Sequence, residues 1–430
     1  MDVSDSTGSS LQAVAGTKFS LQSMAVYTAG NMIGTGTHQT LIALAESGCG
    51  NVLWANFLLA GILVTLSALP LLHLYHKFPS NDCLQQAAAA GLGPFWGKWL
   101  AFVNGQLISI ELIFAVTMQA TFFGKNLAAR FTDVDDVRFS TLLSIALLIF
   151  LCILYRKVGA LFTASIAWAL GVLELCTVGI LILSSAICVL ASKPIRPVES
   201  LVDWSQTTFT KFPSGIHMAI FAYGGFPGMI QSADLVENPG RNVPLGIVCA
   251  CLMTTIIYTA MSVSVLLVSE PAAVASFRNG FDSLRNVLPE HLLAAISCTV
   301  LSSVANNIME NALVVMENMK QMFPMHFSRP ADSFTFAAIG FCTFLNSYLK
   351  LNFLGDAIDF ALILQFAIFA ILCLSSQGGS LGARFVACVS LLANSLLASW
   401  HLYHASAMPM FILTILVALP IFVPQRDKRE

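Results

Sequence analysis

Long apolar stretches follow one another along nearly the whole chain and are separated by short polar segments. Each stretch is about twenty residues long, the length that an α-helix needs to cross the hydrocarbon core of a bilayer. The pattern predicts about twelve such spans. They centre on residues 20–44, 52–75, 95–124, 139–155, 159–190, 214–236, 243–268, 291–318, 332–348, 353–374, 382–399 and 404–422. The short gaps leave no room for a soluble catalytic domain, so we expect an all-α polytopic membrane protein.

Composition supports the same class. Hydrophobic residues make up 57% of the chain and charged residues only 10%, whereas a soluble domain carries about a quarter charged residues. A net charge of -2 argues against a nucleic-acid partner, which would favour a basic face. We expect an integral, multi-pass protein surrounded by the lipid bilayer. The sequence leaves open whether it forms a homo-oligomer.

Motifs for metal binding and catalysis are weak. The 11 cysteines fall mostly inside predicted spans and form no C-x-x-C pair, so they indicate apolar fillers rather than a metal or cofactor site. Gly355-Asp356 is similar to part of the G-x-G-D motif of intramembrane aspartyl proteases, but Phe353 replaces the first glycine. Because no partner motif for a second carboxylate is found and such catalysis needs two, we expect no enzyme and name no catalytic residue.

Two predicted spans are interrupted near their middle. The first contains the glycine-rich segment 30–38, and the sixth contains the segment 221–228 with Pro227. Glycine costs about 1 kcal/mol and proline about 3 kcal/mol in a helix interior. One such cluster can simply allow close helix packing. Two clusters five spans apart instead favour a binding site at broken helices in the two halves of an inverted-repeat transporter. Open amides attract a carboxylate and open carbonyls attract an ammonium group, so an α-amino acid would fit.

The segment after the sixth span carries a family resemblance. Residues 220–247 read IFAYGGFPGMIQSADLVENPGRNVPLGI, and the first span carries Ile33-Gly34-Thr35-Gly36. Both resemble the amino acid–polyamine–organocation superfamily of transporters. The matching residues of the longer segment are Phe221, Ala222, Tyr223, Gly225, Phe226, Asp234, Asn238, Pro239, Arg241, Pro244, Gly246 and Ile247.

The resemblance implies ten core helices in two inverted five-helix repeats, with two peripheral helices. It places an N-terminal tail at 1–18, the first repeat at 19–190 and the second at 214–374. The peripheral helices then occupy 381–422, and a cytoplasmic tail 423–430. It implies a secondary transporter that moves a small amino acid by alternating access, with proton coupling or exchange.

The resemblance also implies where substrate binds. Backbone amides of the first-span motif would hold a carboxylate, carbonyls of the sixth span would hold an amine, and Phe226 would cover the site. The substrate-binding candidates are Ile33, Gly34, Thr35, Gly36, Thr37, His38, Phe221, Ala222, Tyr223, Gly224 and Phe226.

Several positions depart from the family pattern and indicate a divergent member. Thr37-His38 stands where Ile-Phe is usual, and His73 replaces a second-span glutamate. Glu174 falls near a fifth-span position where some members have a lysine of opposite charge. A histidine at 38 can titrate near neutral pH or serve as a structural hydrogen-bond partner.

An ionisable residue inside a span costs free energy because it is removed from water. Such residues are therefore candidates for a functional role. Glu111 shares a helical face with Asn104, and Glu174 is the candidate for proton coupling. Ser303, Asn307 and Glu310 follow an i, i+4, i+7 stripe, for which an interhelical hydrogen bond is the structural alternative. For Asp356 and Asp359, at the start of the tenth span, we expect helix capping.

The turn after the sixth span holds Arg241 near Asp234 and Glu237. The resemblance implies a gating ion-pair network there, and ordinary positive-inside charge is the alternative. Arg156-Lys157, expected in a loop, and the basic C-terminus would be cytoplasmic if the N-terminus is, and we expect both termini in the cytoplasm. We also expect a plasma or inner membrane.

Three functional alternatives remain open. The substrate is a neutral amino acid, or it is a cationic amino acid or polyamine with Glu111, Glu174 and Glu310 as countercharges. The third is a non-transporting amino acid sensor on the same fold, because a fold does not fix a function.

Overall fold

The structure is a computed structural model. It describes residues 18–80, 83–132, 136–190, 196–205, 207, 211–226, 230, 233, 236–277, 280–285, 288–322, 331–349, 351, 353–376 and 379–404. The N-terminal tail up to residue 17, nearly all of the predicted twelfth span (404–422) and the C-terminal tail lie outside this part of the chain. So does Asp234.

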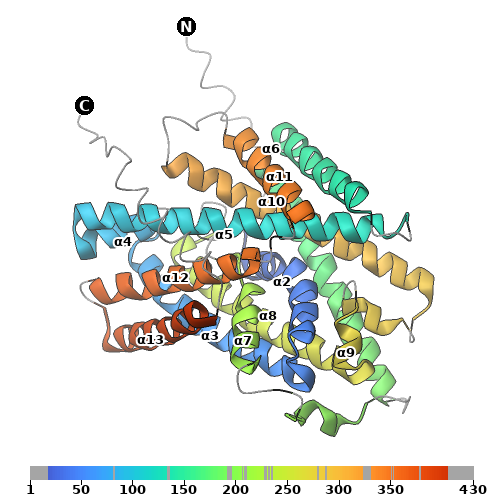
Figure 1. Cartoon of the computed structure of the whole chain (residues 1–430). Helices are drawn as coiled ribbons and strands as arrows, with labels where there is room; N and C mark the ends of the chain where they lie inside the picture. Colours follow the sequence, from blue (N-terminus) through green and yellow to red (C-terminus); the bar gives the residue numbers. More distant parts are fainter. Residues whose placement is uncertain are drawn as a thin grey trace.

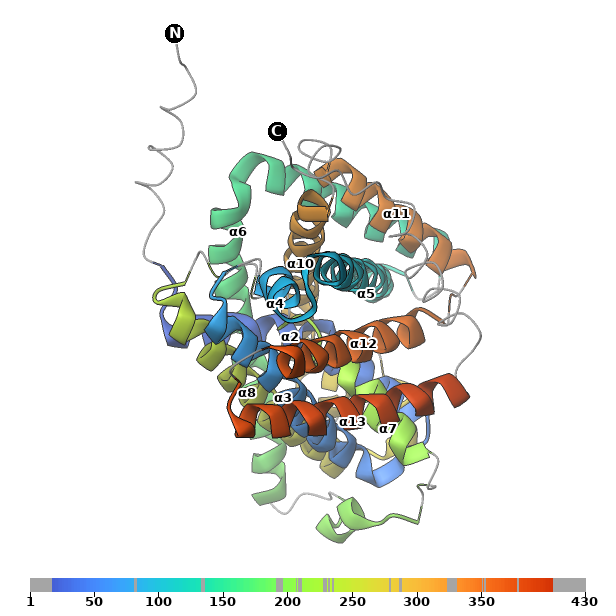
Figure 2. The same cartoon turned by 90° about the vertical axis from the view of Figure 1, so that its left-hand side faces the viewer.

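The described part is built of helices, with a single isolated bridge between Phe19 and Val236 as its only β pairing. The α-helices are α2 (Leu21–Glu46), α3 (Leu53–Lys77), α4 (Cys83–Leu92), α5 (Pro94–Ala128), α6 (Val137–Leu190), α7 (Lys211–Phe221), α8 (Pro239–Val268), α9 (Pro271–Val274), α10 (Glu290–Met322), α11 (Ala331–Leu349), α12 (Phe353–Ser375) and α13 (Leu381–His404). Short 3-10 turns are η1 (Gly50–Val52), η2 (Val198–Val202) and η4 (Gly280–Leu284). In Figures 1 and 2, α2 lies at the centre of the bundle with the other long helices around it.

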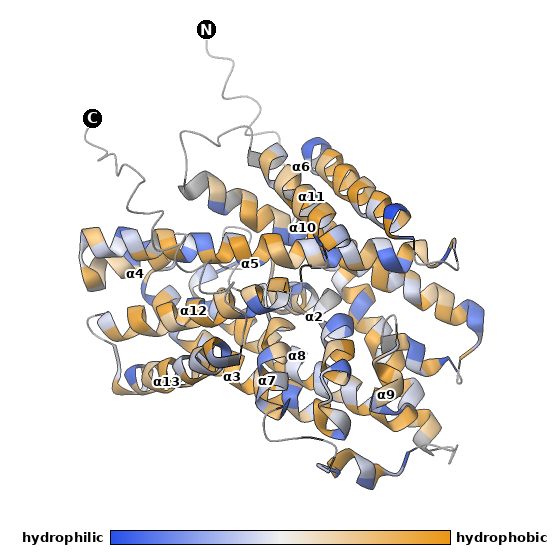
Figure 3. Cartoon of the chain, in the orientation of Figure 1, coloured by the Kyte–Doolittle hydropathy of each residue, from blue (hydrophilic) through white to orange (hydrophobic). Residues whose placement is uncertain are grey.

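Eight segments of these helices are long and apolar enough to cross a membrane. Apolar residues dominate the ribbons of the long helices (Figure 3), and large apolar side chains such as Ile153, Leu183 and Leu392 are exposed. Outward apolar side chains suit a lipid surrounding, in which a helix satisfies most of its backbone groups within its own segment. The predicted multi-pass membrane protein is therefore confirmed at the level of its helices.

The described helices differ from the predicted spans in three places. The predicted fourth and fifth spans form one helix, α6, which is bent in Figure 2. Arg156 and Lys157 therefore lie inside a helix and not in a loop. The short helix α4 was not predicted, and the sixth span is helical only up to Phe221.

Small residues bring α2 close to its neighbours. A β-carbon added at Gly30 would lie 3.0 Å from the Cα of Gly171 on α6, and one at Gly246 on α8 would lie 2.8 Å from the side chain of Met24. Such contacts let helix backbones approach closely where no hydrophobic force drives helices together in lipid. They hold α2 between α6 and α8.

The helix ends define two ends of the bundle. We call one the Glu46 end, because α2 ends there at Glu46 and α12 begins there at Phe353. The ends of α5 and α8 and the start of α10 line a common cavity at this end.

Candidate functional site

The first interruption lies in the middle of α2. Gly34 has non-helical backbone angles (φ -17°, ψ -129°), and the helix continues on both sides of it. Asn307 of α10 fills the gap and donates its side-chain N–H to the backbone carbonyl of Asn31 at 3.2 Å. A β-carbon added at Gly34 would overlap this Asn307 amide nitrogen. A neighbouring helix thus supplies a donor where the α2 ladder is broken, as buried backbone groups require.

The second interruption ends α7. The helix stops at Phe221, and Ala222–Gly225 form turns. Gly225 has φ 98°, a conformation that glycine adopts without a steric penalty. Phe226 is fully buried and stacks on Phe366 of α12, with ring centroids 5.7 Å apart. The following residue, Pro227, is outside the described part of the chain.

The two interruptions meet at the centre of the bundle. A β-carbon added at Gly36 would lie 2.9 Å from the Cα of Ala222, so any side chain at position 36 forces the backbones apart. The hydroxyl of Tyr258, on α8, lies 2.5 Å from Met32 O and 2.8 Å from Ala222 O. A hydroxyl carries one hydrogen, so the carbonyls of α2 and α7 share a single donor. Sequence reasoning missed Tyr258, although a buried tyrosine in an apolar span needs a polar partner.

The backbone carbonyl oxygens at the end of α7 each face one hydrogen-bond donor. Phe221 O accepts from Gly224 N at 3.0 Å, and Ala222 O faces the Tyr258 hydroxyl. A carbonyl oxygen has two lone pairs, so both oxygens keep capacity for a second donor. Tyr223 turns its hydroxyl away from this point, toward Phe57 O on α3 at 2.7 Å.

Glu111 of α5 lies at the second interruption. Its side chain is buried, with 3% exposed, and its Oε2 accepts from the Gln365 amide of α12 at 2.6 Å. A β-carbon added at Gly224 would lie 3.3 Å from the other oxygen, Oε1. The structure therefore places a carboxylate beside the turn that follows α7. No local sequence signal indicated Gln365, which is 254 residues away along the chain.

A second group of carboxylates faces α10. Glu174 of α6 is buried and accepts a hydrogen bond from the Ser303 hydroxyl. Glu310 accepts from the Asn306 amide at 3.3 Å. Within the described residues, Glu174 Oε1 and Glu310 Oε2 have no hydrogen-bond partner. The polar stripe of α10 thus meets both α2, through Asn307, and α6, through Ser303.

The α2 segment after the break is covered at the Glu46 end. His38 is buried, and its ring is tilted against Phe281 of η4 with centroids 5.3 Å apart. Thr37 donates its hydroxyl to Ile33 O, inside the interrupted turn. The backbone of Thr35 lies in the same segment.

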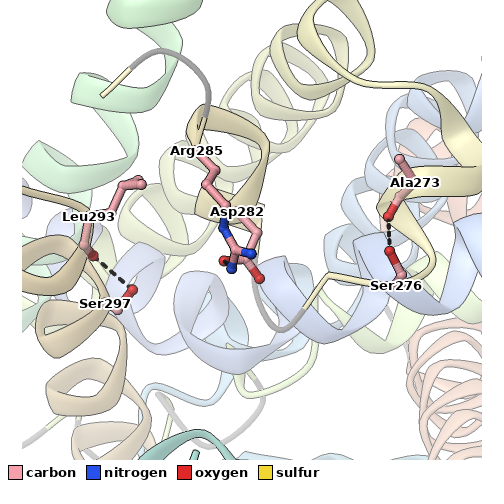
Figure 4. A network of polar contacts seen from close by, with 6 residues as sticks. All are labelled: Ala273, Ser276, Asp282, Arg285, Leu293 and Ser297. Atoms are coloured by element: carbon pink, nitrogen blue, oxygen red, sulfur yellow. Dashed lines mark hydrogen bonds and ion pairs between the residues drawn. The ribbon is translucent and has the colours of Figure 1, made fainter. Parts of the chain in front are cut away.

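Beyond η4 the protein is hollowed. A cavity of about 1300 Å³ lies between the ends of α5, α8 and α10, and a second of about 620 Å³ adjoins it along α2 and α5. Asp282 of η4 and Arg285 line the first cavity. Figure 4 shows Arg285 reaching back to Asp282, with which it forms an ion pair of 3.1 Å. Gln39, next to His38, lines the second cavity. The cavities therefore reach α2 at Gln39, whereas His38 stays buried beneath Phe281.

Other sequence candidates are placed differently. Arg241 is exposed near the start of α8, and it forms no ion pair within the described residues. Asp234 is outside them, so the gating pair stays a prediction. Asp356 occupies the first turn of α12, where capping was expected. For Asp359 that expectation was wrong: its carboxylate is buried and pairs with His217 of α7 at 3.2 Å.

Comparison with known proteins bears on both fold and function. The profile of the amino acid permease family matches residues 19–428. A methylthioribose transporter of Bacillus subtilis is 23% identical over 64% of this chain and 61% of its own length. The vacuolar cationic amino acid transporter 4 of Arabidopsis thaliana is 24% identical over 58% of this chain and 43% of its own. The match thus spans less than two thirds of either relative.

A solved structure shares the fold. A manganese transporter of Eremococcus coleocola superposes with a TM-score of 0.57 at 11% identity, covering 98% of this chain and 95% of that one. This likeness confirms the predicted fold class. The repeat boundaries at 19–190 and 214–374 stay predictions.

Proposed function

Because the chain belongs to the amino acid permease family, we propose that it carries a small amino acid across a membrane by alternating access. The observation that supports this most is the meeting of two broken helices, with Gly36 against Ala222 and Tyr258 beside the carbonyls of both. Broken helices in the two halves of a transporter create paired sites for opposite charges at membrane depth.

In this proposal the α2 segment from Ile33 to His38 holds the substrate carboxylate. Amides that follow a break face outward from the new helix N-terminus and carry partial positive charge. Phe221 O and Ala222 O keep lone pairs for the substrate ammonium. Phe226 stacks on Phe366 close by and closes the apolar side of the site.

Access then alternates between the two ends of the bundle. At the Glu46 end, η4 covers His38 through Phe281, and the cavity lies outside it. A displacement of η4 would open this route, while Asp234 and Arg241 would control the other end. With both termini in the cytoplasm of a plasma or inner membrane, the Glu46 end faces outward.

Glu174 is our candidate for proton coupling. It is buried between α6 and α10, and one of its oxygens has no partner in the described part. A buried carboxylate is far less costly when neutral than when charged. Binding and release of a proton there can therefore be linked to a change in the packing of α6 on α10.

A cationic amino acid is the second candidate substrate, and Glu111 favours it. This carboxylate lies beside Gly224 at the end of α7, where it can pair with a positively charged side chain. Two of the matched relatives are named cationic amino acid transporters.

The test is uptake of radiolabelled neutral and cationic amino acids into proteoliposomes, together with thermal stabilisation of the purified protein. A ligand that binds only the folded state raises the unfolding temperature. We expect both signals for one substrate class. Glu111→Gln should lower cationic uptake about tenfold, since a lost interaction of about 1.4 kcal/mol has that effect, and should leave neutral uptake close to wild type.

Glu199→Gln is the matched control, because it removes the same charge from an exposed position on η2. Stabilisation without uptake would contradict transport and support a sensor. Neither signal with any amino acid would contradict an amino acid substrate.

A further inference from the structure

A cluster of titratable side chains lies outside the site described above, nearer the Glu46 end. His217 of α7 pairs with Asp359 of α12 through Nδ1 at 3.2 Å. His401 of α13 stacks on His217, with ring centroids 4.4 Å apart and planes 23° from parallel. His401 also stacks on Phe360, with centroids 5.2 Å apart and planes 15° from parallel. Helix α7 and the consecutive helices α12 and α13 thus contribute to one cluster, in which His217 contacts both the carboxylate and the second imidazole.

The cluster is buried and incompletely bonded. The exposed fractions of His217, Asp359 and His401 are 6%, 4% and 4%. Within the described residues, His217 Nε2, His401 Nε2 and Asp359 Oδ1 have no hydrogen-bond partner. Apolar residues of similar size would hold three helices together at less cost than a buried charge pair. Packing alone therefore does not explain why histidine and aspartate occupy these positions. Proton exchange explains it, because an imidazole changes charge near neutral pH.

The charges of the cluster favour the uptake of one proton by the two imidazoles. With both imidazoles neutral and the aspartate ionised, the cluster carries a charge of −1, and a proton added to an imidazole nitrogen brings it to zero. A second proton would place two positive rings at the 4.4 Å stacking distance, where like charges repel strongly in a medium of low dielectric constant. The neighbouring acids are Asp356, one turn earlier on α12, and Glu111 on α5, and both interact electrostatically with members of the cluster.

The cluster is connected to the second interruption through two helices, α7 and α12. His217 lies on α7 five positions before Ala222, where the helix is broken. Asp359 lies on the same helix as Gln365, which binds Glu111. A change in the charge of His217 therefore acts on the helix that ends at the second interruption and on the helix that holds the Glu111 carboxylate.

We propose that His217, Asp359 and His401 form a proton-binding site that takes up one proton and, when loaded, holds α7 against α12 and α13. The proposal rests on the proposed function only in treating α7 as a helix that moves during transport. It assigns to α13, otherwise peripheral, a part in the pH dependence of that movement.

The first test needs neither substrate nor transport. Thermal unfolding of the purified protein is measured from pH 5.5 to pH 8 for wild type and for His217→Asn, whose amide can still donate to Asp359 but cannot gain a proton. We expect wild type to exceed the variant most at pH 5.5. The difference should shrink by about 2–4 °C at pH 8, because the pair carries opposite charges only while the imidazole is protonated.

His401→Phe gives a second variant, which keeps a ring at the stacking position on Phe360 and leaves both partners of the His217–Asp359 pair in place. Its difference from wild type should also change with pH. His291→Gln is the control, because it removes a histidine from an exposed position at the start of α10, and its difference should stay constant. Equal differences at every pH for both cluster variants would overturn the proposal.

The second test uses the pH profile of uptake once a substrate is known. We expect the uptake rate of wild type to vary several-fold between pH 5.5 and pH 8 and both cluster variants to flatten this profile. A flat stability difference together with intact amino acid uptake would refute the proton site alone. A pH-dependent stability difference without any uptake would refute the proposed transport and leave the proton site in place.

Discussion

The breaks in the two interrupted helices, α2 and α7, are stabilised in different ways. In α2 the helix resumes after Gly34, and a side chain from another helix, Asn307, fills the gap. In α7 the helix does not resume within the described residues, and the chain turns through Gly225 at φ 98°. The break in α2 is therefore maintained by α10, whereas the break after α7 is built into its own backbone.

The two breaks should therefore respond differently when neighbouring helices move. The shape of the α2 break should change whenever α10 shifts, because the donor to Asn31 O moves with α10. The α7 turn should keep its shape and move as a unit. The carbonyls that flank the two breaks share only one hydroxyl, that of Tyr258, and variants at each contact can test the contrast.

The largest effect is expected where the two breaks touch. Gly36→Leu inserts a side chain against the Ala222 backbone, so the helices must separate. We expect substrate uptake to be lost and the free energy of unfolding to fall by about 1–3 kcal/mol, the usual cost of overpacking. Chemical unfolding and uptake by the same preparation measure both.

Gly179→Ala serves as the comparison, since an added β-carbon there would meet nothing within 4 Å beyond the surrounding turns of its own helix. Alanine at that helical position should stabilise the protein slightly or leave it unchanged. A fully active Gly36→Leu protein would show that the two breaks need not touch.

The next effect tests whether α10 maintains the α2 break. Gly34→Ala should destabilise the wild-type protein, because the new methyl group overlaps the Asn307 amide. In an Asn307→Ala background the same change should cost much less, giving a coupling energy of about 0.5–3 kcal/mol. A double-mutant cycle from unfolding curves measures it. Strictly additive effects would mean that Asn307 does not occupy the gap.

The smallest effect is expected at the shared hydroxyl. Tyr258→Phe keeps the ring contacts with Phe57 and Tyr223 and removes only the donor. We expect a loss of about 0.5–1.5 kcal/mol in stability with a clear reduction in transport rate. Tyr223→Phe removes a similar bond that runs to α3 instead, and it should lower stability without the same reduction in rate. Identical rate losses in both would argue against a special role for Tyr258.

Much of the fold was predictable from periodicity and length. The second predicted span, 52–75, corresponds to α3 at Leu53–Lys77, because a membrane imposes a minimum apolar length that any window detects. The loop expected around Arg156 was wrong because two charged residues do not end a helix whose backbone bonds remain satisfied. The α4 helix escaped notice because ten residues are too few to form a span.

The site was predictable only in part. Glycine clusters indicate where a helix breaks, because each glycine weakens the helix at its own position. They do not reveal what fills the break, and Asn307, Tyr258 and Gln365 all come from helices far away in sequence. Asp359 illustrates the same limit: its position near a helix start indicated capping, and only the packing of α7 on α12 gave it His217 as a partner.

The single hydrogen of the Tyr258 hydroxyl has a mechanical consequence. Met32 O and Ala222 O lie 2.5 and 2.8 Å from the same oxygen, so rotation about one C–O bond passes the hydrogen from one helix to the other. The bond that is lost and the bond that is formed are of the same kind, and the exchange therefore changes the energy little. In the proposed transport cycle, the hydroxyl of α8 can therefore bond to α2 in one state and to α7 in another.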